Sequence, residues 1–300
     1  MRHFVIALLA GSLFYACGGD GSAAMQTSEL GNRYQLYTAN GEGEPVTTGD
    51  FVYFHVIMRT EGDSIMLSTR EDSGSDTPVV QAAADDNTQI GPVEDVVRFM
   101  RVGDSAVVRL NIEEIPNKPP SLQNDTVLLY DVVVTEIVSE EQFTERQAAK
   151  EATREKEREL IRALEPERLE FAATTLEAYN AGTLQGIQTT PSGLKYVIHE
   201  EGTGAEAEPG KGVVVQYIGQ LVSNGNVFDQ SFERGEGIPF PLGAGRVIPG
   251  WDEGIDLLKE GAKATFFIPA ELGYGAQGTP DGSIPADSEL AFYVELEEVQ

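Results

Sequence analysis

Alternating apolar and polar residues predict strands in two separate parts of the chain. In the first part, Asp50–Met58 and Thr126–Val138 are rich in β-branched and aromatic residues, which is typical of strands. Between them, Pro92–Met100 has the composition of a short helix, and Ser105–Ile112 has the pattern of one more strand. Residues 32–138 are therefore predicted to form a β-rich domain with a single small helix.

A second group of strands begins at Leu194. Turns rich in Gly, Pro and Asn separate these strands, and Asn224-Gly225 is a good hairpin signal. The predicted strands are Leu194–His199, Val213–Leu221, Val227–Ser231, Ile238–Leu242, Lys263–Pro269 and Leu290–Val299. Residues 189–300 are predicted to form an antiparallel sheet that curls around a short helix, so the fold class is α+β.

The only tryptophan of the chain stands at the start of that helix. In Val247–Trp251 a tight Pro-Gly turn leads into the helix, where Trp251, Ile255 and Leu258 recur at i, i+4 and i+7. Gly261 supplies a C-terminal stop. These side chains share one face, and the sequence predicts that the indole forms the floor of a cavity.

Between the two β-rich parts lies a segment of helical composition, residues 139–188. Glu, Lys, Arg and Ala dominate Ser139–Leu164, while Pro166 is expected in the first turn of a second helix that ends at Gly182. We expect a solvated helical linker, and the alternative is a homodimer formed through these helices. Apolar residues that could form a stripe against a neighbour are Leu169, Phe171, Leu176 and Tyr179.

The two β-rich parts are laid out alike, which indicates an internal repeat. Aligned segments are Gly49–Val52 with Gly210–Val213, Leu67–Ser68 with Phe228–Asp229, and Ile90–Val93 with Ile248–Trp251. The last strands align Leu128 with Leu290. Two copies of one fold joined by helices is therefore the predicted architecture.

Composition excludes several classes of function. The net charge is -28, from 49 acidic and 21 basic residues, so nucleic acid is excluded as a partner because phosphate backbones require a basic surface. The only histidines are His3, His55 and His199, without the spacing of a metal site. No Gly-rich phosphate loop is present, and no paired carboxylates form a motif. We expect no metal and no cofactor, and the remaining prospect is an apolar ligand pocket.

The N-terminus has the features of an export signal. Arg2 and His3 precede an apolar run that is too short to span a bilayer, which requires about 20 apolar residues. Cys17 is the only cysteine and resembles the lipidated cysteine of a bacterial lipoprotein. We expect residues 1–16 to be a signal peptide, residues 17–31 a lipidated tether, and the protein to be anchored in the cell envelope, at the outer membrane and facing the periplasm. Ordinary signal-peptide cleavage is the alternative.

Residues 189–300 resemble the FKBP-type peptidyl-prolyl cis-trans isomerases. The motifs that carry the resemblance are Thr190–Tyr196, Val215–Tyr217, Val227–Asp229, Val247–Trp251, Leu272–Gly275 and Ile284–Ala286. The resemblance implies that residues 32–138 are a degenerate FKBP-like copy. In the repeat alignment Val56, Leu67, Ser68 and Val93 replace Tyr217, Phe228, Asp229 and Trp251, so the first copy is not expected to be an isomerase.

The resemblance also implies the members of the pocket. The catalytic set is Tyr217, Phe228, Asp229, Ile248, Trp251, Tyr274 and Phe292, and the further substrate-binding residues are Arg234, Ile238, Phe240, Val247 and Ile284. Trp251 is expected under the proline ring, the Ile248 N–H and the Tyr274 hydroxyl as donors to the peptide, and Asp229 as a buried polar group. Ile238 and the Asp281–Ser283 turn depart from the family pattern.

The function expected from the resemblance is isomerisation of X-Pro bonds in exported polypeptide clients, without covalent or acid-base chemistry. The alternative is a chaperone or binding module that grips proline-containing clients without turning them over.

Overall fold

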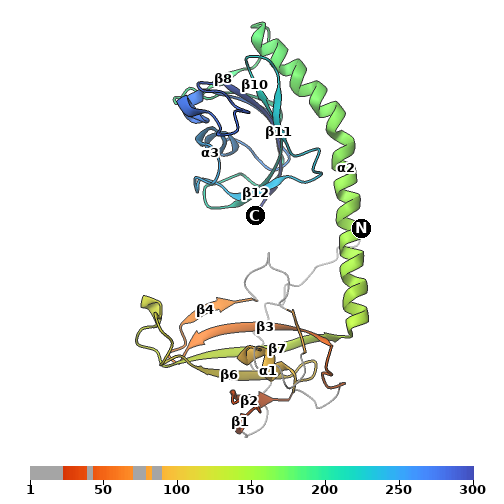
Figure 1. Cartoon of the computed structure of the whole chain (residues 1–300), viewed down its shortest axis with the longest axis vertical. Helices are drawn as coiled ribbons and strands as arrows, with labels where there is room; N and C mark the ends of the chain where they lie inside the picture. The colour runs from red at the N-terminus through yellow and green to blue at the C-terminus, as the bar shows by residue number, and fades with distance from the viewer. Residues whose placement is uncertain (1–22, 39–42, 70–78, 83–89) are drawn as a thin grey trace, which may run out of the picture. The chain divides into compact units, whose positions relative to one another are not determined.

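The computed structural model describes residues 23–38, 43–69, 79–82 and 90–300, and these form two compact units (Figure 1). The first unit is Met1–Arg146 and the second is Gln147–Gln300. Each contains an antiparallel sheet and a short helix, and a long helix lies between the sheets in the sequence. The predicted α+β class with two sheets is confirmed. The expected signal peptide and Cys17 lie outside the described residues.

The first sheet has the strand order β1-β2-β6-β7-β3-β4, with β5 also paired to β3. Its elements are β1 (Met25–Thr27), β2 (Arg33–Tyr37), β3 (Phe51–Thr60), β4 (Ile65–Ser68), β5 (Val79–Gln81), α1 (Pro92–Val97), β6 (Ser105–Asn111), a 3-10 turn η1 (Pro120–Leu122) and β7 (Val127–Val138). The core joins Val96, Val97 and Met100, at and after the end of α1, to Val52 and Phe54 of β3.

Part of the segment expected to be a tether belongs to this sheet. Strand β1 pairs with β2, and the turn that follows it is tied to α1 through the buried Asp95. The Asp95 carboxylate accepts hydrogen bonds from the Ser28 hydroxyl and, at 2.7 Å, from Asn32 Nδ2. The sheet therefore begins before residue 32. The composition of residues 23–31 is that of a linker, but their polar contacts with α1 hold them in place.

The second sheet has the order β8-β9-β13-β14-β10-β11, with β12 also paired to β10. Its elements are β8 (Gln188–Thr189), β9 (Lys195–Glu200), β10 (Gly212–Leu221), β11 (Val227–Gln230), β12 (Ile238–Pro241), α3 (Pro249–Ile255), β13 (Lys263–Ile268), the 3-10 turns η2 (Ala270–Leu272) and η3 (Gly275–Gln277), and β14 (Leu290–Val299). The sheet curls around α3, as the sequence predicts (Figure 1).

Two glycines let α3 approach the sheet closely. A Cβ at Gly250 would lie 2.6 Å from a methyl of Ile268, and a Cβ at Gly254 would lie 2.8 Å from the ring of Phe266. Trp251 and Ile255 are buried in the same core. The helix ends at Ile255, before Gly261, because the following residues form a turn and an isolated bridge with the segment before β10.

The two sheets share one strand order and two irregularities of register. The β3–β7 pairing shifts between Tyr53 and Phe54, and the β10–β14 pairing shifts between Val214 and Val215. The β3–β4 and β10–β11 hairpins each shift as well, after Met58 in the first and after Gly219 in the second. Bulges at matching positions are a more specific sign of a common sheet plan than the number of strands, because each bulge disrupts the hydrogen-bond ladder at one place.

The hairpin register corrects one part of the repeat alignment. Leu67 pairs with Met58, and Asp229 pairs with Gly219. Leu67, and not Ser68, therefore stands at the place of Asp229, and Met66 stands at the place of Phe228. The physical reason is the turn, which is one residue longer between β10 and β11 than between β3 and β4.

The segment between the sheets is one helix, α2 (Glu140–Asn180), and not two. It continues through Pro166, although proline removes one helical hydrogen bond and costs about 3 kcal/mol in a helix interior. After Pro166, Ala172 and Leu176 are buried against the second sheet, and this packing offsets the cost. The second half of α2 is therefore part of the second unit and not a solvated spacer.

Helix α2 is long enough to cross a bilayer but is rich in charged residues. None of the helices in the described ranges is apolar enough over a sufficient length to be a membrane span.

Candidate functional site

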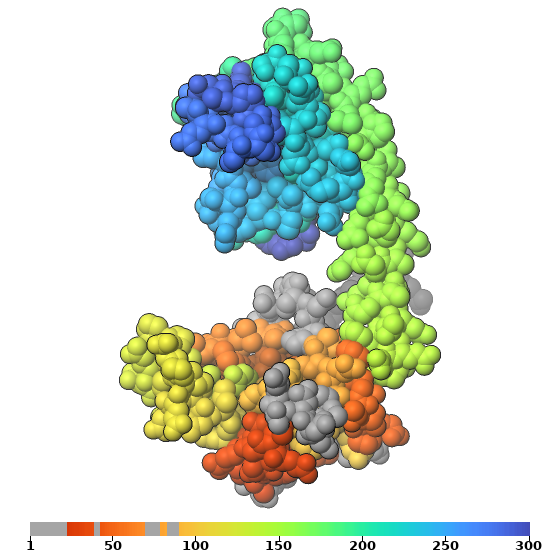
Figure 2. Space-filling model, in the orientation of Figure 1, coloured from red at the N-terminus to blue at the C-terminus, as the bar shows by residue number. Residues whose placement is uncertain are grey.

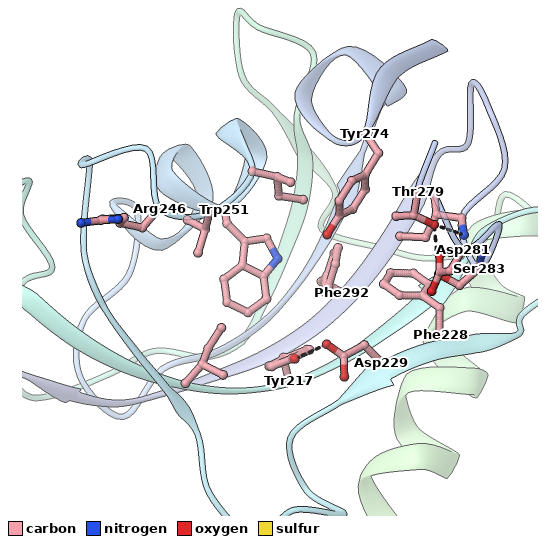
Figure 3. Close-up of a pocket in the computed structure, with 14 residues that line it drawn as sticks. Tyr217, Phe228, Asp229, Arg246, Trp251, Tyr274, Thr279, Asp281, Ser283 and Phe292 are labelled. Carbon is pink, nitrogen blue, oxygen red and sulfur yellow. Dashed lines mark hydrogen bonds between the residues drawn. The ribbon is translucent and has the colours of Figure 1, made fainter. Parts of the chain in front are cut away.

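A cavity of about 410 Å³ opens in the second unit, between the sheet, α3 and the loop after β13 (Figure 3). Its walls come from separate parts of the sequence: β10, β11 and β12, the turn into α3, the loop that follows η2, and β14. The lining residues are Tyr217, Phe228, Asp229, Ile238, Arg246, Val247, Ile248, Trp251, Tyr274, Thr279, Asp281, Ser283, Ile284 and Phe292.

Aromatic rings that meet edge to face form the floor and one wall. The Trp251 ring lies 5.1 Å from that of Tyr217 and 5.3 Å from that of Phe292, at interplanar angles of 83° and 86°. Phe228 meets Phe292 in the same way. Edge-to-face pairs are the preferred geometry of aromatic quadrupoles, so the rings hold one another in place. The buried Trp251 Nε1 has no hydrogen-bond partner within the described part of the chain.

The wall depends on the absence of a side chain at Gly219. A Cβ there would lie 2.7 Å from the Phe228 ring and 2.8 Å from the Phe292 ring. Any side chain at position 219 would therefore overlap these rings. In the first sheet Met58 stands at the matching place, and the sequence offered no signal that singled out Gly219.

Tyr217 and Asp229 form the polar corner of the cavity, and Arg234 bonds both of them from outside the lining. The Tyr217 hydroxyl donates a hydrogen bond to Asp229. Arg234 donates through Nη1 to Asp229 Oδ1 and through Nη2 to the Tyr217 oxygen, both at 2.9 Å. Burial, and then the bond to Asp229, raises the pKa of Tyr217 to about 12. Tyr217 is therefore a neutral donor across the physiological pH range.

The resemblance implied that Asp229 is buried, and this is wrong. Its side chain stands at the cavity mouth with an exposed fraction of 48%. Its position is fixed by hydrogen bonds instead. Besides Tyr217 and Arg234, the backbone N–H of Gln230 donates to Asp229 Oδ1 at 2.8 Å.

Two donors at the cavity have no acceptor among the described residues. Ile248 is the N-cap of α3, so its N–H precedes the helical hydrogen-bond ladder. The Tyr274 hydroxyl points into the cavity (Figure 3). Burial raises the pKa of Tyr274, which keeps the hydroxyl protonated. The cavity thus presents an apolar interior with donors on its rim.

Most of the residues that the resemblance implied are brought together here. The exceptions are Arg234 and Phe240. Arg234 lies behind Asp229, and Phe240 is buried next to Trp251, with the ring centroids 5.9 Å apart. Phe240 is therefore a core residue that supports the floor.

The loop of residues 279–284 closes one side of the cavity. Thr279 N–H donates to the Ile284 carbonyl and Ile284 N–H donates to Thr279 Oγ1, both at 2.9 Å. Hydrogen bonds from Thr279 and Ser283 lower the pKa of Asp281. The turn that departs from the family pattern is thus internally bonded, and it delivers the buried Ile284 to the cavity.

Arg246 is a lining residue that the sequence reasoning missed. The carboxylate of Asp252 accepts hydrogen bonds from the backbone of Gly243 at 2.9 Å and of Gly245 at 3.1 Å, which holds the loop before Arg246. No carboxylate of the described ranges forms an ion pair with Arg246. Figure 3 shows it on the side of the cavity opposite Asp281.

Known proteins match the part of the chain that contains this cavity. A family model described as "FKBP-type peptidyl-prolyl cis-trans isomerase" matches residues 204–297. The FKBP-type peptidyl-prolyl cis-trans isomerase FkpA of Aeromonas hydrophila is 46% identical over 112 residues, which are 37% of this chain and 40% of that relative. An FK506-binding protein of Neisseria meningitidis serogroup A is 48% identical over 97 residues, which are 32% of this chain and 87% of that relative.

A yeast relative and a solved structure match this region as well. The peptidyl-prolyl cis-trans isomerase FPR2 of Saccharomyces cerevisiae is 47% identical over 95 residues, which are 32% of this chain and 70% of that relative. The crystal structure of FkpA from Escherichia coli is 34% identical, and the match covers 54% of this chain and 74% of that chain with a TM-score of 0.37. The sequence match spans less than half the length of the FkpA relative of Aeromonas hydrophila.

Proposed function

This chain belongs to the FKBP-type peptidyl-prolyl cis-trans isomerase family, and on that premise we propose that its second unit catalyses the cis-trans isomerisation of X-Pro bonds in polypeptides. The observation that carries the proposal is the cavity itself. Aromatic rings form its floor, and two donors that lack an acceptor in the described part of the chain, the Ile248 N–H and the Tyr274 hydroxyl, stand at its rim.

The reaction requires no covalent step. Rotation about the X-Pro bond has a barrier of roughly 20 kcal/mol, because resonance gives the planar imide a charge-separated character that the twisted form lacks. An apolar cavity that excludes water stabilises the less polar twisted form more than the planar ground state. Each 1.4 kcal/mol or so of this difference increases the rate tenfold.

The residues have distinct roles in this proposal. The Trp251 indole supports the proline ring, and Phe228 and Phe292 enclose it. The Ile248 N–H and the Tyr274 hydroxyl donate to carbonyls of the bound peptide. Asp229 faces the twisting carbonyl, and its hydrogen bonds to Tyr217 and Arg234 keep it there.

The test is catalysis on a substrate too small to be a chaperone client. The full chain is expected to accelerate cis-trans exchange in a short X-Pro peptide and to accelerate proline-limited refolding of a protein. Trp251→Ala and Tyr274→Phe are expected to reduce both rates. Tyr196→Phe is the matched control, because the Tyr196 hydroxyl bonds Gln188 and does not line the cavity.

The rival function is a chaperone that binds clients without turnover. It is favoured if refolding yields rise while the peptide exchange rate stays at its uncatalysed value, and this result removes the isomerase proposal. If the wild type accelerates exchange and both cavity variants equal it, the cavity is not the site of catalysis.

We also propose that FK506 binds this cavity, because two of the similar proteins are named FK506-binding proteins. Trp251 is the only tryptophan, so the intrinsic fluorescence of the full chain reports on the cavity floor. FK506 is expected to change this fluorescence and to inhibit peptide exchange at one equivalent per chain.

The same titration tests the first unit, which we propose is not an isomerase. Val93 replaces Trp251 in the repeat alignment, and the hairpin register places Leu67 at the position of Asp229. Calorimetry that finds two equivalents of FK506 per chain would overturn this assignment.

We propose that the protein acts on exported clients while anchored through a lipid on Cys17. The proposal is supported by the short apolar run before Cys17 and by Leu13–Cys17, which resembles the lipidation motif of bacterial lipoproteins. Mass spectrometry of the mature N-terminus is expected to find a diacylated or triacylated Cys17. An unmodified Cys17, or cleavage at another residue, removes the anchor from the proposal.

A further inference from the structure

The second half of α2 covers the outer face of the second sheet, although it lies outside the family match at residues 204–297 (Figure 2). Ala172 packs with Ile218, Phe232 and Tyr293, which are all buried. Further along, Leu176 packs with Val222, Phe267 and Ala291. The strand residues among them lie on the side of the sheet away from the cavity, and Val222 and Phe232 follow β10 and β11. The unit therefore depends on α2 to remove these apolar side chains from water.

Ring and charge contacts fix the position of the helix on the sheet. The Tyr179 ring stacks on Phe267 with the centroids 3.7 Å apart. Arg168 Nε lies 2.5 Å from Glu295 Oε1, which also accepts a hydrogen bond from the Tyr293 hydroxyl at 2.6 Å. The Arg168 and Glu295 side chains are each only 15% exposed, so this ion pair is shielded from water.

Helix α2 also contacts the loop that carries Arg234. Arg162 Nη2 donates to the Arg234 backbone carbonyl at 3.3 Å, and Glu165 Oε1 accepts a hydrogen bond from Gln230 Nε2 at 2.8 Å. A Cβ on Gly235 would lie 2.8 Å from the Cβ and backbone oxygen of Arg158, so the loop rests directly on the helix. Gly235 has φ 79°, which also favours glycine.

The other side of the same segment faces the cavity. The Arg234 side chain bonds Asp229 and Tyr217, and the Gln230 N–H bonds Asp229. Arg234 and Gln230 are thus each held by α2 on one side and joined to the polar corner of the cavity on the other. Phe232 lies between them in sequence and is buried against the helix.

We propose that Arg162 and Glu165 of α2 are positioning residues of the isomerase site, which act by holding Arg234 and Gln230 so that Asp229 keeps its place at the cavity mouth. The proposal rests on the proposed function. It makes α2 a working part of the isomerase unit, although the helix lies outside the family match. The Asp229 side chain is half exposed, so hydrogen bonds rather than burial must hold it. Two of these bonds come from Arg234 and Gln230, and α2 bonds both of those residues.

The variants are Glu165→Ala and Arg162→Ala in the full chain. Each is expected to lower kcat/KM for X-Pro peptide exchange about fivefold, the effect of losing one hydrogen bond. Glu165→Gln keeps an acceptor oxygen and is expected to restore the wild-type value. Glu170→Ala and Arg154→Ala are matched controls on the same helix and are expected to leave kcat/KM unchanged. If Glu165→Ala and Arg162→Ala both equal the wild type, the proposal fails.

A double-mutant cycle separates positioning from general destabilisation. If Glu165 acts through Asp229, Glu165→Ala has no further effect on kcat/KM in a chain that already carries Asp229→Ala. Independent contributions, in which the two losses multiply, contradict the proposal.

Hydrogen exchange provides a readout that does not depend on activity. The Gly235 N–H, which bonds the Ser231 and Phe232 carbonyls, is expected to exchange faster in Arg162→Ala and Glu165→Ala than in the two controls. If the wild type proves inactive while this exchange still changes, the proposed function fails and the contact between α2 and the loop stands. If the wild type is active and the exchange does not change, the positioning proposal fails.

Discussion

The Phe228 ring meets the Phe292 ring edge to face, with the centroids 5.5 Å apart at an interplanar angle of 83°. Both rings lie over the backbone of Gly219, where a Cβ has no room. One wall of the cavity therefore depends on a residue without a side chain. The first sheet has Met58 at the matching place.

Gly219→Ala is accordingly expected to displace one or both rings. Overpacking of a closely packed site costs about 1–3 kcal/mol, so the free energy of unfolding should fall by that amount. Peptide exchange should slow more than tenfold, because the wall against the proline ring moves. Ala264→Gly on the buried strand β13, which is separated from β10 by β14, is a control for a backbone change away from the wall. A variant with wild-type kcat/KM would show that the close packing at Gly219 does not shape the cavity.

The raised pKa of Tyr217 has a measurable effect on stability at alkaline pH. The unfolded chain loses the tyrosine proton near pH 10, and the folded chain loses it near pH 12. The protonated Tyr217 therefore makes its full contribution to the free energy of unfolding below pH 10. This contribution is lost as the pH rises toward 12, by about 1.4 kcal/mol per pH unit. Urea unfolding of Tyr217→Phe should lack this part of the decline. Equal slopes in the two proteins between pH 10 and 12 would contradict the assignment.

His199 is expected to make the second unit sensitive to mild acid. Its ring packs edge-on against Phe171 of α2, 4.8 Å away, and its Nε2 lies 2.8 Å from Thr265 Oγ1. Burial lowers the pKa of His199 below its usual value near 6.5. The neutral His199 ring therefore makes its full contribution to the free energy of unfolding above pH 6.5. This contribution is lost as the pH falls through the folded-state pKa.

This acid sensitivity can be measured against a variant that does not titrate. Between pH 7.5 and 5 the free energy of unfolding of the wild type should fall more than that of His199→Gln, which retains a group able to bond Thr265. The carboxylates near this site, Glu200 and Glu295, are the same in both proteins, so the difference isolates the imidazole. If the free energies of unfolding of the two proteins differ by the same amount at every pH in this range, the result is evidence against a buried, neutral His199.

Arg246 is expected to influence which clients are turned over. Because it lines the cavity without an ion pair to any described residue, an acidic side chain next to the proline gains a favourable interaction. In X-Pro peptide exchange, a glutamate-containing peptide should be preferred over its lysine counterpart, and Arg246→Glu should shift the ratio of their kcat/KM values about fivefold or more. The shift should shrink in 1 M salt, where charges are screened within about 3 Å. A ratio that Arg246→Glu leaves unchanged would remove Arg246 from the client-binding surface.

Local patterns in the sequence were sufficient for the strands and for the short helix at Trp251. Alternating residues and turn signals act over a few positions, so β10, β13 and β14 could be predicted close to their observed bounds. The same holds for the site residues in compact motifs. Val247–Trp251 places Val247, Ile248 and the indole together through a single turn, whatever the rest of the chain does.

Other features depend on contacts between segments that are distant in the sequence, and these became visible only in the folded chain. The role of Gly219 arises from two rings that arrive from β11 and β14, and the helix continues through Pro166 because residues after it pack on a sheet that begins later in the chain. A one-residue difference in a turn set the register of β4. The two-sheet plan and the Trp251 motif could be predicted from the sequence, because they follow from local propensity and spacing. The support of Arg234 by α2 was decided by long-range packing, which no local pattern encodes.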